Sequence, residues 1–256
     1  MIRKSTYRVM LFCCLFYAIG CNSEKAGDCL QTAGSMRRES RTVTDFSTIT
    51  VFEYLNLVVR QGPDFSVEVE SGANLLNDIT AEVIDGRLVL RNENRCNLFR
   101  DYGISTVYVT APNLTEIRSG TGFLVSSEGP LAYPNLTLLS ERFIDPEAEA
   151  TDGEFDIDFA GSRLNVFVNG IAYIKLRGTA DIFDVFIAAG DARIEAQGLQ
   201  ARVVDLDHRG SNDLFVDPQE RIEGVIRGYG DVIGVNRPAE VEVSELFNGR
   251  LRFSSE

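Results

Sequence analysis

His208 is the only histidine of the chain and the first residue whose type could carry catalysis. It stands in the run Asp205-Leu206-Asp207-His208-Arg209-Gly210, where alternation puts Leu206 and His208 on one side of a strand and Asp207 on the other. His208 is therefore either a strand-end residue at a turn or half of an Asp-His dyad, and we favour the strand end. Hydrolysis by a serine nucleophile is disfavoured because the chain has no G-x-S-x-G motif.

Carboxylates are the second candidate for chemistry. Asp191 and Asp231 each follow a glycine at equivalent positions of a repeat, and Asn212 and Asp213 lie near the corresponding position between them. Such a row could bind Ca²⁺ or act as an acid/base pair. Tight corners also use Gly-Asp and Ser-Asn, and we favour this structural interpretation because the G-G-x-G-x-D pattern of calcium-bound β-rolls is absent. We expect no cofactor.

Aromatic side chains could instead bind a sugar. Five tyrosines are candidate stacking platforms: Tyr102, Tyr108, Tyr133, Tyr173 and Tyr229. Phe155, Phe159 and Phe167 lie on the apolar side of alternating segments and are predicted to be core. The chain has no tryptophan, which disfavours a dedicated carbohydrate site. The sequence ranks none of the tyrosines above the others.

The first 20 residues have the pattern of an export signal. Arg3, Lys4 and Arg8 form a basic region, and residues 9–19 form an apolar region too short to span a membrane. The run Ala18-Ile19-Gly20-Cys21 is typical of bacterial lipoprotein cleavage, after which Cys21 is acylated; ordinary secretory cleavage is the alternative. We expect a lipoprotein anchored in a membrane, with the outer membrane as the expected location and the periplasm or the cell surface as the exposed side.

Cysteine usage agrees with export. Cys13 and Cys14 leave with the signal and Cys21 takes lipid, so Cys29 and Cys96 are the two thiols left in the folded part. Two thiols in an oxidising compartment usually pair, and closing this long loop would stabilise the fold by about 4 kcal/mol. A metal site is disfavoured because the chain has one histidine and no C-x-x-C pair.

The mature chain is strongly acidic. Removing the three basic residues of the signal leaves 22 Lys and Arg (25 minus 3) against 38 Asp and Glu, a formal charge of −16. An acidic surface repels phosphate backbones, so nucleic acid is excluded as a partner. The charge either keeps an exported protein soluble or serves cation binding, and we favour solubility.

A period in the second half predicts the architecture that must position these residues. Glycine falls at positions 170, 190, 210 and 230, and polar and apolar residues alternate between them. This spacing is typical of a parallel β-helix or β-solenoid with coils of about 20 residues, in which each coil buries its apolar face against the next. Ile174, Ile194 and Leu214, each four residues after a glycine, are predicted to share an interior row.

The rest of the chain predicts an all-β fold with two abutting lobes. We expect a polar tether over residues 21–44, an N-terminal β lobe over 45–150 and a C-terminal β-solenoid lobe over 151–256. The first lobe begins with a strand, the turn 61–64 and a second strand, and residues 74–79 allow one helical turn. Residues 83–90 predict a hairpin, because Asp85-Gly86 suits a tight primed turn.

Four segments resemble a known family. They are Cys29-Leu30-Gln31-Thr32-Ala33-Gly34, Asn74-Leu75-Leu76, Arg91-Asn92-Glu93-Asn94-Arg95-Cys96-Asn97-Leu98 and Ala111-Pro112-Asn113-Leu114-Thr115-Glu116-Ile117. The chain resembles the head GIN domain family, described as auto-transporter adhesins, over about residues 29–240. Members of this family are exported, mostly as lipoproteins. The resemblance therefore implies an exported protein with a β-solenoid fold and no established activity.

Two functions from different classes remain. The first is a non-catalytic cell-envelope lipoprotein that presents an elongated surface to a glycan or a cell-surface protein. The alternative is a polysaccharide-active lyase or hydrolase on the same fold, which would need Asp with Lys or Arg along a groove. Lys175 is the only lysine after residue 30, which favours the first function.

Overall fold

Strands are the main regular structure of the described residues, with almost no helix, which confirms the prediction of an all-β fold. The computed structural model describes residues 27–254 apart from 53, 99 and 144–149. Two single-turn 3₁₀ helices occur in this part, η2 (Asp28–Leu30) and η3 (Leu76–Asp78), the second of them at the predicted helical turn. The strands are β1 (Met36–Arg41), β2 (Thr48–Val51), β3 (Asn56–Gln61), β4 (Ser66–Gly72), β5 (Ile79–Ile84), β6 (Arg87–Asn92), β7 (Thr106–Ala111), β8 (Glu116–Ser119), β9 (Leu124–Ser127), β10 (Asn135–Ser140), β11 (Glu154–Gly170), β12 (Tyr173–Gly190), β13 (Arg193–His208), β14 (Leu214–Ile226), β15 (Val232–Gly234), β16 (Glu240–Glu245) and β17 (Leu251–Phe253).

All of these strands belong to one sheet with a mixed strand order. The long strands β11 to β14 contribute to two ladders, because each passes through a corner halfway along. Ladder A runs β1, β4, β7, β3, β9, then the first halves of β11 to β14, then β15 and β17. Ladder B runs β5, β6, β2, β8, β10, then the second halves of β11 to β14, then β16. The pairs of β4 with β1 and β7, and of β5 with β6, are antiparallel, and the other pairs are parallel.

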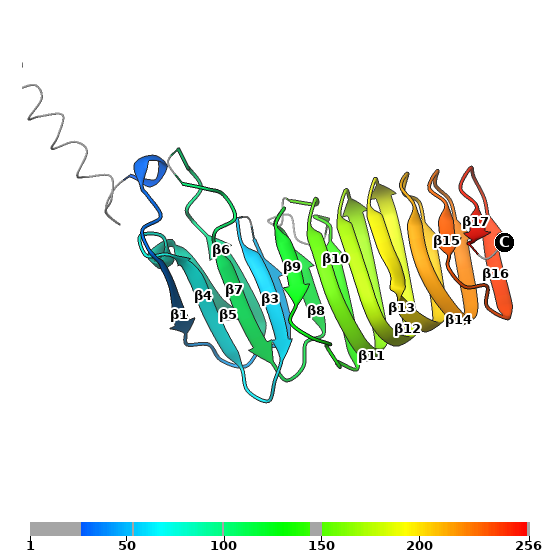
Figure 1. The fold of residues 1–256 in the computed structure, drawn as a ribbon, viewed down its shortest axis with the longest axis horizontal. Coiled ribbons are helices and arrows are strands. Elements are labelled where there is room, and N and C mark those ends of the chain that lie inside the picture. The colour runs from blue at the N-terminus through cyan, green and yellow to red at the C-terminus, as the bar shows by residue number, and fades with distance from the viewer. Residues whose placement is uncertain (1–26, 53, 99, 144–149, 255–256) are drawn as a thin grey trace, which may run out of the picture.

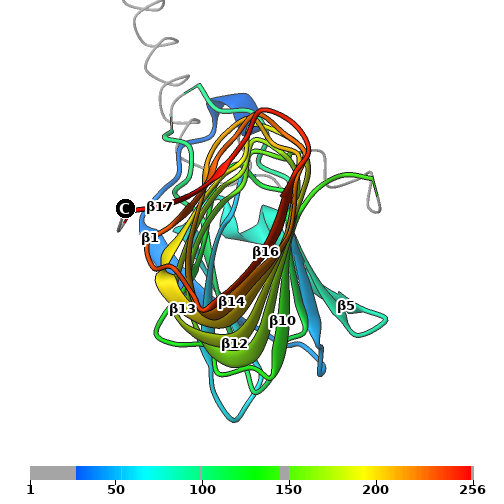
Figure 2. The same ribbon diagram turned by 90° about the vertical axis from the view of Figure 1, so that its right-hand side faces the viewer.

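The strands lie side by side along the long axis of an elongated molecule (Figure 1). Seen from the end, the sheet curls round and nearly closes on itself, and the hairpin that contains β5 projects from one side (Figure 2). The apolar side chains fill the space between ladders A and B, and one continuous core reaches from Phe46 to Phe253. Each ladder therefore has an inner face on this core and an outer face toward solvent.

The predicted interior row is confirmed. Ile174 on β12 lies opposite Ile194 on β13, which lies opposite Leu214 on β14, and all three are buried. Phe155 on β11 extends the row by one strand. The neighbours Arg193 and Glu195 are half-exposed on the outer face, as alternation requires.

Glycine is required at the turn where β12 ends and the chain passes to β13. The amide of Asp191 donates to the carbonyl oxygen of Gly170 at 2.9 Å. A Cβ atom on Gly190 would stand 2.0 Å from that same oxygen, and Gly190 has a φ of +101°. Only glycine accepts both the contact and this backbone conformation, which explains the glycine at position 190.

The Asp-Gly hairpin is also confirmed. β5 and β6 pair in antiparallel register from Ile84 opposite Arg87 to Ile79 opposite Asn92. Asp85 and Gly86 between them have φ angles of 51° and 76°. Positive φ at both central positions is the requirement of the type I′ turn, whose twist matches that of the flanking strands.

The N-terminal segment differs from its prediction. Residues 36–41 lie in the expected tether but form β1, which pairs with β4 from Met36 opposite Gly72 to Arg41 opposite Val67. Alternation could not reveal this strand because neither of its faces is buried in the core. Backbone pairing and the ion pair of Arg38 with Glu70 hold it instead.

Phe155 and Phe159 are core residues as predicted, but the prediction for Phe167 is wrong. β11 buries Phe155, Ile157 and Phe159 before the corner, and Leu164 and Val166 after it. The corner thus shifts the alternation by one residue, and Phe167 is left half-exposed on the outer face. This shift brings an aromatic ring to the surface of ladder B.

Candidate functional site

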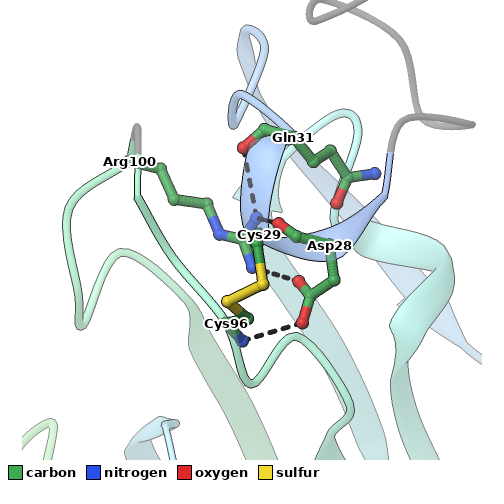
Figure 3. Close-up of a disulfide and its surroundings, with 5 residues drawn as sticks. All are labelled: Asp28, Cys29, Gln31, Cys96 and Arg100. Carbon is green, nitrogen blue, oxygen red and sulfur yellow. Dashed lines mark hydrogen bonds and ion pairs between the residues drawn. A yellow bond between two sulfur atoms is a disulfide. The ribbon is translucent and has the colours of Figure 1, made fainter.

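Three of the four segments that resemble the known family, residues 29–34, 74–76 and 91–98, meet at the N-terminal end of the sheet. The fourth, residues 111–117, joins β7 to β8. Cys29 and Cys96 form a disulfide, with Cα atoms 4.5 Å apart (Figure 3). The Asp28 carboxylate accepts a hydrogen bond from the amide of Cys96 at 2.7 Å, and it forms an ion pair with Arg100. Burial disfavours ionisation of Asp28, but the hydrogen bonds from Arg100 and Cys96 outweigh it and lower the pKa of this carboxyl. The loop before β7 is thereby fastened to η2.

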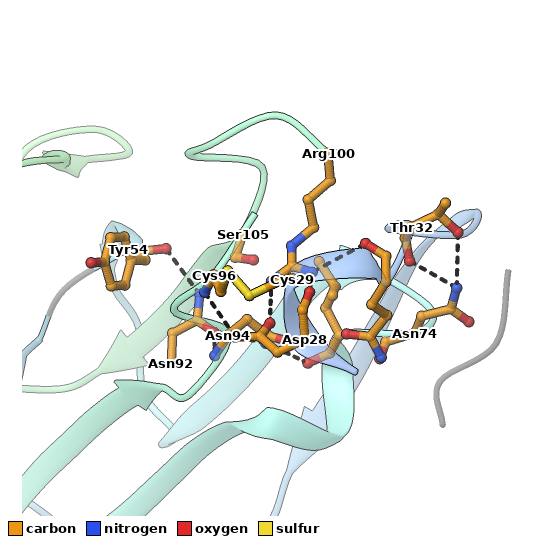
Figure 4. A network of polar contacts seen from close by, with 12 residues as sticks. Asp28, Cys29, Thr32, Tyr54, Asn74, Asn92, Asn94, Cys96, Arg100 and Ser105 are labelled. Atoms are coloured by element: carbon orange, nitrogen blue, oxygen red, sulfur yellow. Dashed lines mark hydrogen bonds and ion pairs between the residues drawn. A yellow bond between two sulfur atoms is a disulfide. The ribbon is translucent and has the colours of Figure 1, made fainter. Parts of the chain in front are cut away.

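Asparagine side chains continue this polar network (Figure 4). Asn74 donates to the backbone oxygen of Thr32 at 2.9 Å, and Asn92 donates to that of Tyr54 at 3.2 Å. Asn94 is 7% exposed and donates to Leu75 O at 3.0 Å and to Asn92 Oδ1 at 2.8 Å. Most of these bonds are made to backbone carbonyls. The network therefore fixes loops at the end of the stack, which is the role of a cap.

An open groove lies on the outer face of ladder B, across β10 to β13. It encloses about 580 Å³ and is lined by outward side chains from all four strands. Leu139, Phe167 and Phe186 lie opposite one another on β10, β11 and β12 and form an apolar row along it. The rings of Phe167 and Phe186 are 5.0 Å apart with planes inclined by 31°. Two half-exposed aromatic rings thus stand on a rigid sheet rather than in the core.

A polar row borders the aromatic rings. Asn165, Asp184, Asp205, Glu223 and Glu242 lie opposite one another on consecutive strands from β11 to β16. Asp184 is paired with Arg163, and Glu223 with Arg221 at 3.1 Å. Asp205 has a raised pKa because partial burial and the carboxylates of Asp184 and Glu223 disfavour its ionisation. The groove therefore offers aromatic faces beside amide and carboxylate acceptors.

His208 is placed as the strand-end prediction requires. It is the last residue of β13, it is fully buried, and its Nδ1 accepts a hydrogen bond from the amide of Gly210 at 3.3 Å. Asp207 lies on the other face and pairs with Arg209 at 3.5 Å and Arg227 at 3.3 Å, so the two do not form a dyad. Burial lowers the pKa of His208, although the Asn212 backbone and nearby carboxylates oppose the shift.

The corner carboxylates make structural hydrogen bonds. Asp191 accepts from the Ser211 hydroxyl at 2.7 Å, and Asp213 accepts from the amide of Asp231 at 3.0 Å. Asp231 in turn accepts from the amide of Arg250 at 2.8 Å and pairs with Arg252 at 2.6 Å. Burial disfavours the charge of Asp231, but these donors outweigh it and lower its pKa.

The side chain of the remaining residue of this row, Asn212, accepts a hydrogen bond at its Oδ1 from the amide of Asp213 at 2.9 Å. These bonds agree with turn chemistry. Within residues 27–254, as far as they are described, no cluster of three or more His, Cys, Asp or Glu side chains is arranged to hold a metal ion.

The five candidate tyrosines lie on different elements and form no common platform. Tyr133 is buried and donates to Ala111 O at 3.2 Å, so the prediction of a surface role is wrong for it. Tyr108 and Tyr173 donate to Glu70 and Glu195 at 2.7 and 2.9 Å.

Tyr102 and Tyr229 are exposed. The ring of Tyr102 lies 6.3 Å from that of Tyr54, and the ring of Tyr229 meets Phe247 edge-on at 4.9 Å. The aromatic pair of the groove, Phe167 and Phe186, is absent from the sequence-based candidates. Their positions could be found only from the strand register.

The fold defines an elongated all-β protein with an open groove on its outer face. Comparison with known proteins identifies the family to which this fold belongs. Residues 45–238 match the model of the family described as "Putative auto-transporter adhesin, head GIN domain". The chain therefore belongs to the head GIN domain family, as its sequence motifs indicate. No curated protein matches the chain.

Solved structures share the fold. A putative adhesin from Bacteroides fragilis has a TM-score of 0.75 at 22% identity, over 87% of this chain and 99% of its own. A putative lipid binding protein from Parabacteroides distasonis scores 0.59 at 15% identity, over 86% of this chain and 97% of its own. A putative adhesin from Parabacteroides merdae has a TM-score of 0.59 at 16% identity, over 86% of this chain and 96% of its own. These likenesses concern the fold alone.

The family membership bears on where the protein is located. The adhesin family suggests an extracellular or envelope setting. Among the residues that the structure describes, no helix is long and apolar enough to cross a bilayer. Cys21 and the signal segment lie outside the described residues.

Proposed function

We propose that the protein is a non-catalytic adhesin-type module of the cell envelope that binds a neutral glycan in the groove on ladder B. The observation that carries the proposal is the pair Phe167 and Phe186 beside Asn165 and Asp184. Aromatic faces accept the C–H surface of a sugar ring, and amide or carboxylate oxygens accept its hydroxyl protons. A cell-surface protein is the other ligand class that this open face admits.

The charge of the groove supports a neutral ligand. Asp184, Asp205 and Asp207 all line it, and Arg163 is the one basic residue among its described lining residues. This excess of carboxylates repels uronic and sialic acids. An uncharged polysaccharide fits the groove better than an anionic one.

The proposed adhesin has two lobes and a lipid anchor. We propose a β-solenoid of coils of about 20 residues, with an N-terminal lobe over 45–150 and a C-terminal lobe over 151–256. All pairs among β11 to β17 are parallel, which supports this division, whereas antiparallel pairs occur among the strands before residue 150. Acylation of Cys21 would hold the cap end near a membrane, with the outer membrane as the proposed location.

A screen of immobilised glycans with the soluble chain from residue 22 tests the proposal. We expect binding to neutral glycans and loss of that binding in Phe186→Ala. The matched control is Phe215→Ala, because Phe215 is a half-exposed phenylalanine on the outer face of ladder A. Binding that Phe215→Ala weakens and Phe186→Ala leaves intact would move the site to ladder A and contradict the proposal.

A polysaccharide-active enzyme is the second candidate. The raised pKa of Asp205 beside Asp184, which Arg163 neutralises, is the observation in its favour, since paired carboxylates in different protonation states serve acid/base hydrolysis. Release of reducing ends from a bound glycan, abolished in Asp205→Asn, would establish the enzyme. Binding without product release supports the adhesin.

A further inference from the structure

The last strand of ladder B has an open edge. β16 pairs with β14 on one side, and no strand among the described residues pairs with it on the other (Figure 1). An unpaired strand edge presents backbone N–H and C=O groups that can pair with another strand. The C-terminal end of the stack therefore offers a template for strand addition.

The backbone groups at this edge can be assigned. Leu246 donates its amide hydrogen to Ile226 O on β14 at 2.8 Å. Because neighbouring residues of a strand point their amides to opposite edges, Glu242 and Ser244 also face β14, and Val241 and Val243 face the open edge. The side chains of these two valines belong to the core face, since Val241 lies opposite the buried Ile222. Val241 is nevertheless 38% exposed, so the core is incompletely covered here.

The opposite end of the molecule is protected. On β1, the edge strand of ladder A, the core-face positions are Arg37, Glu39 and Arg41, with Glu39 opposite Val69 and Arg41 opposite Val67. Charges that point inward on an edge strand prevent a further strand from extending the core. β16 has valines at the first two of its core-face positions, Val241 and Val243, and the charge at the third, Glu245, accepts a hydrogen bond from the amide of Leu251 at 2.8 Å. The part of the edge formed by the two valines therefore lacks this protection.

The acidic side chains of β16 favour a partner strand that carries basic residues. Its solvent-facing positions include Glu240 and Glu242, and Glu242 lies opposite Glu223 on β14. A second copy of β16 laid against this edge would bring carboxylates together, which disfavours self-association. A strand with basic residues on its outer face and apolar residues on its inner face would complement both faces of β16.

We infer that β16 is a docking edge for an extended segment of a partner protein in which basic residues alternate with apolar ones. The segment adds one strand to ladder B, and its backbone pairs with Val241 and Val243. Its basic side chains neutralise Glu242 and approach Glu240, which also lies 4.0 Å from Arg221. This interaction is independent of the proposed glycan groove.

Binding of a capped, fluorescent Lys-Val-Lys-Val-Lys-Val peptide to the soluble chain tests the inference. We expect binding that weakens with salt, and slower hydrogen exchange at Val241 and Val243 in the complex. A peptide of the same composition with blocked order, Lys-Lys-Lys-Val-Val-Val, controls for charge alone. Equal affinity for the two peptides, or protection confined to amides outside residues 240–245, would overturn the inference.

Two variants separate the backbone from the charge. Val243→Pro removes an outward amide without touching a bond to β14, and we expect affinity to fall by about tenfold or more. Glu242→Lys should weaken binding of the basic peptide and allow a Glu-Val-Glu-Val-Glu-Val peptide to bind. Asp64→Lys, in the exposed turn after β3, is the matched charge control and should leave affinity unchanged. Phe186→Ala should also leave it unchanged, which distinguishes this edge from the groove.

Discussion

Phe167 and Phe186 face one another across two adjacent parallel strands, with ring centroids 5.0 Å apart, on the solvent side of the sheet. Buried phenylalanines of the same strands, Phe155 and Phe183, point the other way into the core. The outer pair therefore leaves apolar surface exposed beside a row of carboxylates, and the proposed glycan site rests on this surface.

The interior row gives the first prediction. Ile194→Ala should lower the free energy of unfolding by about 2–5 kcal/mol, because it removes buried methyl and methylene groups and leaves a cavity between Ile174 and Leu214. Arg193→Ala, one residue away on the outer face, should cost about 0.5 kcal/mol or less. Urea unfolding of both variants measures the difference. Equal losses would contradict the assignment of inner and outer faces.

The disulfide gives the second prediction. Replacing Cys29 and Cys96 by serine should lower the free energy of unfolding by about 4 kcal/mol, because the bond closes a separation of 67 residues in the unfolded chain. Mass spectrometry of a non-reduced digest should find the two peptides joined in protein isolated from the envelope. Free thiols at both positions there would refute the pairing in the cell.

The third prediction concerns the anchor. Cys21→Ser should move the protein from the detergent phase to the aqueous phase, because the thiol that accepts the acyl chains is gone. Phase partition and the intact mass of both proteins measure this. A wild-type chain without acyl mass would exclude lipidation, and retention of the serine variant on the membrane would assign attachment to another part of the chain.

His208 gives the fourth prediction, on pH. Burial lowers its pKa in the fold below the ordinary value of 6.5, so the unfolded chain binds the proton first as the pH falls. The free energy of unfolding should therefore decrease as the pH drops below 6.5, and the loss is complete only below the folded pKa. His208→Met should flatten this dependence below pH 6.5.

Carboxylates with lowered pKa, such as Asp28 and Asp231, affect a separate window. Their ordinary value is 3.8, and the stability that they contribute is lost only as the pH falls below it. An unchanged slope just below pH 6.5 in His208→Met would assign the dependence to other groups.

The sequence predicts the features that depend on local spacing. The recurring glycine and the alternation around Ile194 place the interior row, and Asp85-Gly86 places the hairpin, because each rests on neighbours along the chain. β1 escapes prediction because it is held by pairing with β4 and buries no face.

The groove on ladder B escapes prediction for a different reason. A corner in β11 shifts the alternation before Phe167, and the residues of the polar row are unevenly spaced along the chain. Register across strands is set by bulges and corners, which a periodic pattern does not encode. The side chains of the groove come together only when that register is known.

Calorimetric titration of the soluble chain with the neutral glycan that binds best in the screen tests the central claim most directly. The account predicts measurable binding to the wild type, at least about tenfold weaker binding in Phe167→Ala and in Phe186→Ala, and unchanged binding in Phe215→Ala. Wild-type affinity in both groove variants, with their folding verified by circular dichroism, would contradict a glycan site on ladder B.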